Sequence, residues 1–183
     1  FIENRTGLSQ QNKENYIVYA GRISLEKGVE ELIKAFKNAN LLNFKLKIIG
    51  EGPEYLNLSN KYCSDSVKFY GLLPNSKTID IISKSTAVVT ATKLLEGQPM
   101  LLCEASSLGI PTIFPNTGGI SEFYPENYQL MFEQFNYTDL IQKLELINDR
   151  KYVADIGLKN KEYIEQYLSE QRLLEKIKSA INE

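Results

Sequence analysis

The sequence has 183 residues, of which 43% are hydrophobic and 24% charged, so it is long enough to form one domain with its own core. Its 21 basic and 23 acidic residues are interspersed and give a net charge of −2, which argues against nucleic acid as a partner. The two cysteines, Cys63 and Cys103, form no C-x-x-C pair, and the chain has no histidine, so no ordinary zinc ligand set is present.

The apolar runs, the cysteines and the first residue of the chain help to predict its cellular compartment and whether it is complete. The apolar runs fall well short of the roughly 20 residues that a membrane span needs. Two unpaired thiols suit a reducing compartment, so we expect a cytoplasmic protein. The chain begins at Phe1 without an initiator methionine or a signal peptide, so we expect it to be a piece of a longer protein.

Short runs rich in β-branched and aromatic residues alternate with longer segments of helical period, which is the pattern of βαβ units. The expected strands cover residues 16–21, 45–50, 67–71, 87–91, 112–115 and 128–132. The expected helices follow Gly28, Pro53, Pro74, Pro99 and Gly119 and also cover residues 138–149. The alternation predicts an α/β fold, a Rossmann-like doubly wound parallel sheet of about six strands with helices on both faces.

The periodicity also predicts how the chain is divided. Residues 1–15 are rich in Asn, Gln and Glu and are expected to form a flexible leading segment before a domain over residues 16–168. Beyond residue 148 the pattern is purely helical. Ser169 is expected to cap a last helix, and residues 169–183 then form a C-terminal helix with an exposed apolar strip.

In an open α/β sheet, ligands bind at the carboxyl ends of the strands. The loop Gly21 to Gly28, G-R-I-S-L-E-K-G, directly follows the first strand and carries Arg22 and Lys27. A planar guanidinium and a mobile ammonium together suit a diphosphate. The alternative is that both are surface charges, one of them paired with Glu26.

Two further loops lie at the same predicted edge. The second strand ends in Gly50-Glu51-Gly52, but the complete G-x-G-x-x-G and Walker patterns are absent, which argues against a nicotinamide enzyme and a P-loop nucleoside triphosphatase. The third strand ends at Gly71-Leu72-Leu73. That loop either offers backbone groups to a nucleobase or is a plain turn before a helix.

The fourth strand leads into a loop with Glu96 and a helix with Glu104, eight residues further on. Pro99 suits the first turn of that helix, and the free amides of Met100 and its neighbours would form an anion site. An isolated carboxylate among apolar residues must reach water, find a cation or accept hydrogen bonds, and a vicinal diol suits it well. The alternative is that Glu104 lies on a solvated strip of the helix.

Six short motifs occur in the order and spacing of one enzyme family: GRISLEKG, IIGEGP, VKFYG, EGQPMLLCEA, GIP and NTGGISE. With them the chain resembles the retaining glycosyltransferases of family 4. The resemblance runs from about Tyr16 to the end and covers the C-terminal, nucleotide-sugar-binding half of the two-domain GT-B fold.

The resemblance implies roles for individual residues. Arg22, Lys27 and Glu96 would be the catalytic residues: the two cations would hold and stabilise the departing diphosphate, and Glu96 would contact the donor sugar. Glu104 would bind the ribose hydroxyls. Backbone groups around Tyr70 to Leu73 would meet the base. The other donor-binding residues would be Gly21, Gly50, Tyr70, Gly71, Leu72, Leu73, Gly97, Gln98, Met100 and Leu101.

The resemblance also implies partners and an outcome. The donor is a nucleoside diphosphate sugar, the anomeric configuration is retained, and no cofactor or metal is expected. The absent N-terminal half would hold a glycan or lipid acceptor, so the isolated domain would bind donor without turnover. Membrane contact would come only indirectly, at the inner face, through that half. Surface polysaccharide or glycolipid biosynthesis is the expected pathway.

One departure from the family pattern lies just before Glu96. Members often carry Pro-Ser where this chain has Ala91-Thr92, which changes the loop that leads to the carboxylate. Two other functions remain open from the residues: a non-catalytic nucleotide-binding or assembly module with the same fold, and a sugar-nucleotide epimerase. Four charged residues at one crevice favour the transferase over the first, and the order of the motifs favours it over the second.

Overall fold

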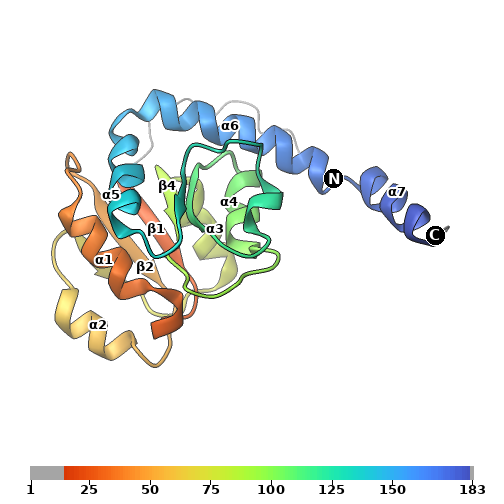
Figure 1. The fold of residues 1–183 in the computed structure, drawn as a ribbon. Helices are drawn as coiled ribbons and strands as arrows, with labels where there is room; N and C mark the ends of the chain where they lie inside the picture. The colour runs from red at the N-terminus through yellow and green to blue at the C-terminus, as the bar shows by residue number, and fades with distance from the viewer. Residues whose placement is uncertain (1–14, 182–183) are drawn as a thin grey trace.

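The computed structural model describes residues 15–181, which form one parallel sheet with helices on both of its faces (Figure 1). The sheet has six strands in the order β3-β2-β1-β4-β5-β6, and all neighbouring pairs are parallel. The strands are β1 (Tyr16–Ala20), β2 (Lys45–Ile49), β3 (Val67–Phe69), β4 (Ala87–Val89), β5 (Thr112–Asn116) and β6 (Met131–Glu133). The doubly wound sheet expected from the sequence is confirmed.

The helices form two layers. Helix α1 packs beside α5 on one face, whereas α4 packs against α3 and α6 on the other. Every helix in residues 15–181 is too short or too polar to serve as a membrane span. The helices are α1 (Val29–Asn38), α2 (Tyr55–Tyr62), α3 (Asn75–Ser83), α4 (Met100–Ser107), α5 (Tyr137–Glu145), α6 (Arg150–Tyr167) and α7 (Glu170–Ile181), with 3-10 turns η2 (Leu25–Lys27), η3 (Ile120–Phe123) and η4 (Leu146–Asn148).

The central strands are apolar throughout because helices cover both faces of the sheet. Ile17 and Val18 in β1 are adjacent in sequence and therefore point to opposite faces, yet both are fully buried. On one side the sheet meets Leu32 of α1, and on the other it meets Leu102 of α4. This burial holds the carboxyl ends of β1 and β4 in place for the loops that follow them.

One predicted strand is displaced. Residues 128–132 were expected to be extended, but β6 begins only at Met131. Tyr128 instead turns its ring into the core, where it stacks on Phe114, and its hydroxyl donates to the carbonyl oxygen of Thr112 at 3.0 Å. Asn127, at φ 61°, makes the turn that points the ring inward. Tyr128, an aromatic residue in a short apolar run, therefore packs into the core and does not pair in the sheet.

The helix predictions are confirmed in position, with two differences at their ends. The segment after Gly119 is a 3-10 turn of four residues, and the helix expected to reach residue 149 ends as an α-helix at Glu145. The Ser169 hydroxyl accepts a hydrogen bond from the Arg172 amide at 3.4 Å, as an N-cap of α7 should. The predicted leading segment lies almost entirely outside the described residues.

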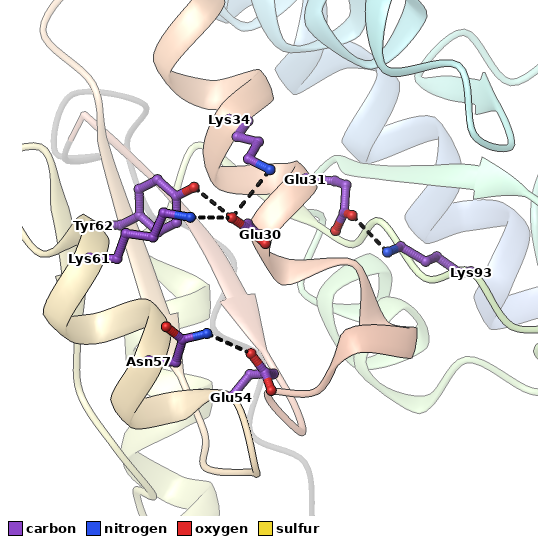
Figure 2. Close-up of polar contacts among 8 residues, drawn as sticks. All are labelled: Glu30, Glu31, Lys34, Glu54, Asn57, Lys61, Tyr62 and Lys93. Atoms are coloured by element: carbon purple, nitrogen blue, oxygen red, sulfur yellow. Dashed lines mark hydrogen bonds and ion pairs between the residues drawn. The ribbon is translucent and has the colours of Figure 1, made fainter.

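A cluster around Glu30 joins α1 to α2 (Figure 2). The Glu30 carboxylate accepts hydrogen bonds from the Tyr62 hydroxyl at 2.7 Å and the Lys61 ammonium at 3.0 Å, and it pairs with Lys34 at 3.2 Å. These donors lower the pKa of Glu30 from 4.5 to about 2, the Tyr62 hydrogen bond being the largest cause. The charged form of this carboxylate is therefore the one that stabilises the fold.

Replacing Glu30 with Gln should lower the free energy of unfolding by about 1 kcal/mol near neutral pH, because the amide loses its attraction to two ammonium groups. Since folding lowers the Glu30 pKa, this contribution is complete above about pH 4.5 and is lost as the pH falls towards 2. Urea unfolding across this range should show the difference between the two proteins closing. The exposed Glu126, replaced in the same way, is the control. A difference that persists in acid would contradict the ion-pair account.

Candidate functional site

A cleft of about 310 Å³ opens at the carboxyl ends of β1 and β4. The strand order reverses between these two strands, and such switch points are where open α/β sheets bind ligands. The lining side chains come from the ends of the two strands, the two loops that follow them, α4 and η3: Tyr19, Ala20, Gly21, Arg22, Lys27, Thr90, Thr92, Glu96, Gln98, Pro99, Met100, Leu101, Leu102 and Ile120.

A second cleft, of about 370 Å³, lies beside the first on the β2 side. The two share the segment Ala20, Gly21 and Arg22, so the end of β1 forms the partition between them. The remaining lining residues come from the ends of β2 and β3 and from α3: Ile49, Gly50, Glu51, Leu72, Leu73 and Thr78. A ligand with two linked parts could therefore occupy both clefts at once, with Arg22 between the two parts.

The loop after β1 is held in place by backbone contacts. The Gly21 amide donates to the Ile49 carbonyl at 2.9 Å, and Ile23 is fully buried. Gly28 ends the loop at φ 65°, where an added Cβ would lie 2.0 Å from the carbonyl oxygen of Ala91. Only glycine fits there without moving the backbone. Arg22 projects from this rigid loop, is exposed, and makes no ion pair within residues 15–181.

The loop after β4 is fastened to the first loop and to α1. The Lys93 amide donates to the Glu26 carbonyl at 2.8 Å, and the Lys93 ammonium pairs with Glu31 of α1 at 2.7 Å (Figure 2). That hydrogen bond is the largest cause of the raised pKa of Lys93. From the other side, Gly119 donates its amide to the Glu96 carbonyl at 2.8 Å. Glu96 is thus fixed by its neighbours before any ligand arrives.

Two of the predicted site residues form an ion pair. The Lys27 ammonium contacts Oε1 of Glu96 at 2.5 Å, and the Thr92 hydroxyl donates to the same oxygen at 2.9 Å. No described contact reaches Oε2 of Glu96. Both side chains are 27% exposed. The ion pair of Lys27 is thus with Glu96, whereas the sequence left open a pairing of Arg22 or Lys27 with Glu26. Both cations lie near enough to Glu26 to contribute, after a hydrogen bond from its own backbone, to lowering its pKa.

The sequence prediction missed several residues of the cleft lining, and it also missed three side chains whose polar contacts hold the site together: Tyr19, Thr92 and Lys93. Thr92 and Lys93 directly follow the fourth strand at the edge where ligands bind, so their position was a usable signal. Tyr19 carried no such signal, because it reads as an ordinary strand residue. Its hydroxyl donates to the Arg22 carbonyl at 2.7 Å, and burial, followed by the charge of Glu96, raises its pKa well above the usual value.

The start of α4 offers backbone donors to the first cleft. The first helical hydrogen bond runs from the Cys103 amide to the Pro99 carbonyl at 3.0 Å, so the amides of Met100, Leu101 and Leu102 have no acceptor within the helix. All three residues line the cleft. Pro99 was expected in the first turn but precedes it as the N-cap residue. The helix dipole adds partial positive charge at the same place.

Glu104 lies further along α4, half-buried and outside the lining of both clefts. Its carboxylate makes no hydrogen bond or ion pair within the described part of the chain. It is close enough to Cys103 to contribute, after burial, to raising the pKa of that thiol to about 11. The predicted role of Glu104 in binding ribose hydroxyls therefore stays a prediction.

The predicted base-binding segment divides at Gly71. Leu72 and Leu73 line the second cleft, and the Gly71 carbonyl accepts from the Gly50 amide at 2.8 Å. Tyr70 lies elsewhere: its amide is used in pairing with Ile48, at 2.9 Å, and its side chain lines a separate groove. The structure therefore does not bring Tyr70 to the clefts, although it brings the two residues that follow Gly71.

The remaining predicted residues are Gly97 and Gln98, which lie on the exposed part of the loop between Glu96 and Pro99. Gln98 lines the first cleft, whereas Gly97 has open space around it. Within residues 15–181, no group of three or more His, Cys, Asp or Glu side chains is arranged to hold a metal ion.

Comparison with known sequences gives one family. The chain matches the family described as glycosyl transferases group 1 over residues 1–167. It is 30% identical over 142 residues to the amylovoran biosynthesis glycosyltransferase AmsD of Erwinia amylovora, covering 74% of this chain and 39% of AmsD. It is 28% identical over 189 residues to the capsular polysaccharide biosynthesis glycosyltransferase CapM of Staphylococcus aureus, covering 92% of this chain and 46% of CapM.

Among solved structures, the fold is similar to that of a TarM mutant from S. aureus in complex with fondaparinux, α-GlcNAc-glycerol and UDP. The TM-score is 0.80 at 22% identity, over 100% of this chain and 38% of the TarM chain. The six-stranded sheet is thus that of the C-terminal, Rossmann-like half of a GT-B glycosyltransferase, as the resemblance implied. The chain spans less than half the length of the curated relatives AmsD and CapM.

The two glycines beside Glu96 and Lys27 allow a matched test of the loop contact. Replacing Gly28 with Ala should lower the free energy of unfolding by at least about 2 kcal/mol, because a left-handed backbone and a clash with the Ala91 carbonyl add together. Replacing Gly97 with Ala should change it by no more than about 0.5 kcal/mol, since nothing lies within 4 Å. Denaturant unfolding measures both. Equal effects of the two changes would contradict the close loop contact.

Proposed function

Because the chain belongs to the group 1 glycosyl transferases, we propose that it is the donor-binding domain of a retaining, metal-independent enzyme of this family. The enzyme transfers a sugar from a nucleoside diphosphate to a glycan or lipid acceptor. The observation that carries the proposal is the convergence of Arg22, Lys27 and the free amides of α4 on one cleft at the strand switch point. These groups match a diphosphate in charge and in hydrogen-bond donors.

The diphosphate is the part of the donor that this cleft suits best. Arg22 lies on the partition between the two clefts, so its guanidinium reaches a phosphate group from either side. Lys27 and the amides of Met100 and Leu101 face the same space from two directions. The sugar then lies on the Glu96 side, and the nucleoside lies in the second cleft, against Leu72 and Leu73.

The chemistry needs stabilisation of a leaving group. As the bond between the anomeric carbon and the diphosphate breaks, negative charge develops on the diphosphate oxygens. Fixed cations and amides are worth most where charge develops, because they need no rearrangement at that moment. Arg22 and Lys27 supply the cations, and the first turn of α4 supplies the amides. Retention of configuration requires the acceptor oxygen to arrive on the face from which the diphosphate departs.

Glu96 is arranged to hold the donor sugar. Its Oε1 is occupied by Lys27 and Thr92, which leaves Oε2 for a sugar hydroxyl. A carboxylate with one oxygen fixed by the protein has less freedom to lose when the other accepts a hydrogen bond. Glu104 is proposed to accept from the ribose hydroxyls, further along the same helix.

We propose that the enzyme has a further N-terminal domain and that this domain supplies the acceptor site. AmsD and CapM are each more than twice as long as the part of them that this chain matches. Helix α7 extends away from the rest of the domain (Figure 1) and exposes Leu174 and Ile177, three residues apart on one helical face. We propose that this face packs against the N-terminal domain. Through that domain the cytoplasmic enzyme would meet a membrane-bound acceptor.

The pathway is proposed from the relatives. AmsD and CapM are named for the biosynthesis of amylovoran and of capsular polysaccharide. A role in surface polysaccharide or glycolipid assembly fits a donor-binding domain of this family.

Calorimetric titration with UDP, GDP and ADP tests the donor site, and UDP comes first because it is the nucleotide bound to TarM. One nucleotide should bind saturably. Replacing Arg22 with Ala should weaken that binding at least about tenfold, or roughly 1.4 kcal/mol, because the guanidinium contacts the phosphates. Replacing Glu104 with Ala should weaken the binding of the nucleotide. It should not change the binding of inorganic diphosphate, because that ligand has no ribose.

The control is Lys151→Ala, which removes one exposed cation from α6, outside both clefts. It should leave nucleotide binding unchanged. An equal loss in the Arg22 and Lys151 variants would indicate attraction by overall charge, and the proposed diphosphate site would then be wrong. If full-length protein with donor and acceptor shows binding but no transfer, the non-catalytic module is the correct function.

A further inference from the structure

The charged side chains that line the first cleft are few. Among its described lining residues, only Arg22, Lys27 and Glu96 carry a charge. The second cleft shares Arg22 and adds the carboxylate of Glu51, so it brings no further cation. A ligand that enters both clefts therefore meets two cations and no third one among the described lining residues.

The proposed donor uses both cations. This step rests on the proposed function, in which the diphosphate lies against Arg22, Lys27 and the start of α4. A diphosphate that joins a nucleoside to a sugar carries one negative charge on each phosphate group near neutral pH. The two cations balance these two charges, so the filled cleft keeps the negative charge of Glu96. A further negative charge on the ligand must then be held against Glu96, which is electrostatically unfavourable.

The part of the first cleft that the proposed sugar would occupy is lined by Glu96, Gln98 and Ile120, and we call it the sugar end. The amide of Gln98 is neutral and Ile120 is apolar, so neither balances a charge. Lys93 also lies on the loop after β4, but its ammonium pairs with Glu31 at 2.7 Å and it is not among the described lining residues. The described lining thus leaves no cation for an acidic group on the sugar.

The negative charge of Glu96 acts within the cleft although Lys27 pairs with it. Tyr19 lines the same cleft, and the charge of Glu96 is, after burial, the next cause of the raised pKa of its hydroxyl. A second carboxylate lies close to the backbone of Glu96. An added Cβ on Gly119 would be 3.4 Å from Oε1 of Glu122 and 3.9 Å from the Glu96 carbonyl oxygen. Both observations indicate that the sugar end favours an uncharged group.

We propose that the donor sugar is neutral, a hexose or an N-acetylhexosamine, and that Glu96 excludes sugars that carry a carboxylate, sulfonate or phosphate group. The inference rests on the proposed function, because it concerns the sugar of the proposed donor. A neutral sugar offers hydroxyl groups that donate to Oε2 of Glu96, whereas an acidic sugar adds a charge that no described lining cation is left to balance. A repulsive charge is a usual means of separating ligands of similar shape. Glu96 is thus a specificity-determining residue.

The test is titration of the 183-residue chain with UDP-glucose and UDP-glucuronate, which differ only in the group at the last carbon of the sugar. The acidic donor should bind at least about tenfold more weakly than the neutral one, because its carboxylate meets the negative charge of Glu96. UDP-galactose and UDP-galacturonate should show the same order. If the nucleotide titration selects GDP or ADP, the matched pairs are GDP-mannose with GDP-mannuronate and ADP-glucose with ADP-glucuronate.

Two substitutions test whether charge causes the difference. In Glu96→Gln the ratio of the two affinities should fall to within about threefold, even if both donors bind more weakly. In Gln98→Lys the acidic donor should gain at least about threefold over the neutral one, because an ammonium replaces a neutral amide in the cleft lining. Gln98 is exposed, so this variant should fold and keeps the test decisive if Glu96→Gln abolishes sugar binding. The control Gln166→Lys adds the same charge at an exposed position of α6 outside both clefts and should leave the ratio unchanged.

The outcomes separate this inference from the proposed function. Equal binding of neutral and acidic donors would overturn the inference and leave the donor site standing. A ratio that stays unchanged in either variant that still binds donor would mean that shape rather than charge rejects the acidic sugar, and the inference would again be wrong. If UDP, GDP and ADP all fail to bind, the proposed function fails and the inference falls with it.

Discussion

The site depends on one close contact, in which the loop after β1 lies directly on the loop after β4. Gly28 has no side chain to hold these backbones apart, and the Lys93 amide donates to the Glu26 carbonyl across the same junction. The contact occurs where the strand order reverses, so the two loops diverge beyond it and leave the cleft between them. Without that contact, Lys27 and Glu96, which are 69 residues apart in sequence, would not meet.

The pairing of Lys27 with Glu96 has a consequence for ligand binding. The Lys27 ammonium is already paired with a carboxylate, whereas Arg22 makes no ion pair within residues 15–181 and only contributes, from a distance, to lowering the pKa of Glu26. If the proposed donor binds here, its diphosphate would be drawn first by Arg22 and the amides of α4, and it would compete with Glu96 for Lys27. The Thr92 hydroxyl donates to the same Glu96 oxygen and would keep that carboxylate in place during the competition. Lys27 would then strengthen its contact with phosphate as negative charge develops there.

The fold could be predicted almost completely from the sequence because its signals are local. Buried parallel strands read as continuous apolar runs, and α1 has a clear apolar stripe. The strand predicted at residues 128–132 was placed too early in the sequence, because Tyr128 resembles a typical strand residue. Nothing nearby in sequence shows that its ring stacks on Phe114. A side chain that packs sideways into the core cannot be recognised from propensity alone.

The candidate site was predicted less completely than the fold, because its contacts join residues that are far apart in sequence. The rule that ligands meet the carboxyl ends of strands predicted that Arg22, Lys27 and Glu96 lie at one edge of the sheet, where all three line the first cleft, because the rule needs only the order of strands and loops. It does not say which charges pair, so the contacts of Thr92 and Lys93 were missed. It also does not say which way a side chain at the end of an edge strand points, and Tyr70 lines a hollow separate from both clefts.

The same sheet explains why charged groups gather in two different ways, at the ends of the strands and along one face of β2. Parallel strands direct all their carboxyl ends to one edge, where backbone amides and helix starts favour anions such as phosphate. The pleat separates alternate side chains by face, so Lys45 and Lys47 gather on one side of β2 independently of what the loops do. Charge at the two clefts therefore comes mainly from loops and helix ends, whereas the charge that β2 presents comes from the alternation of its side chains.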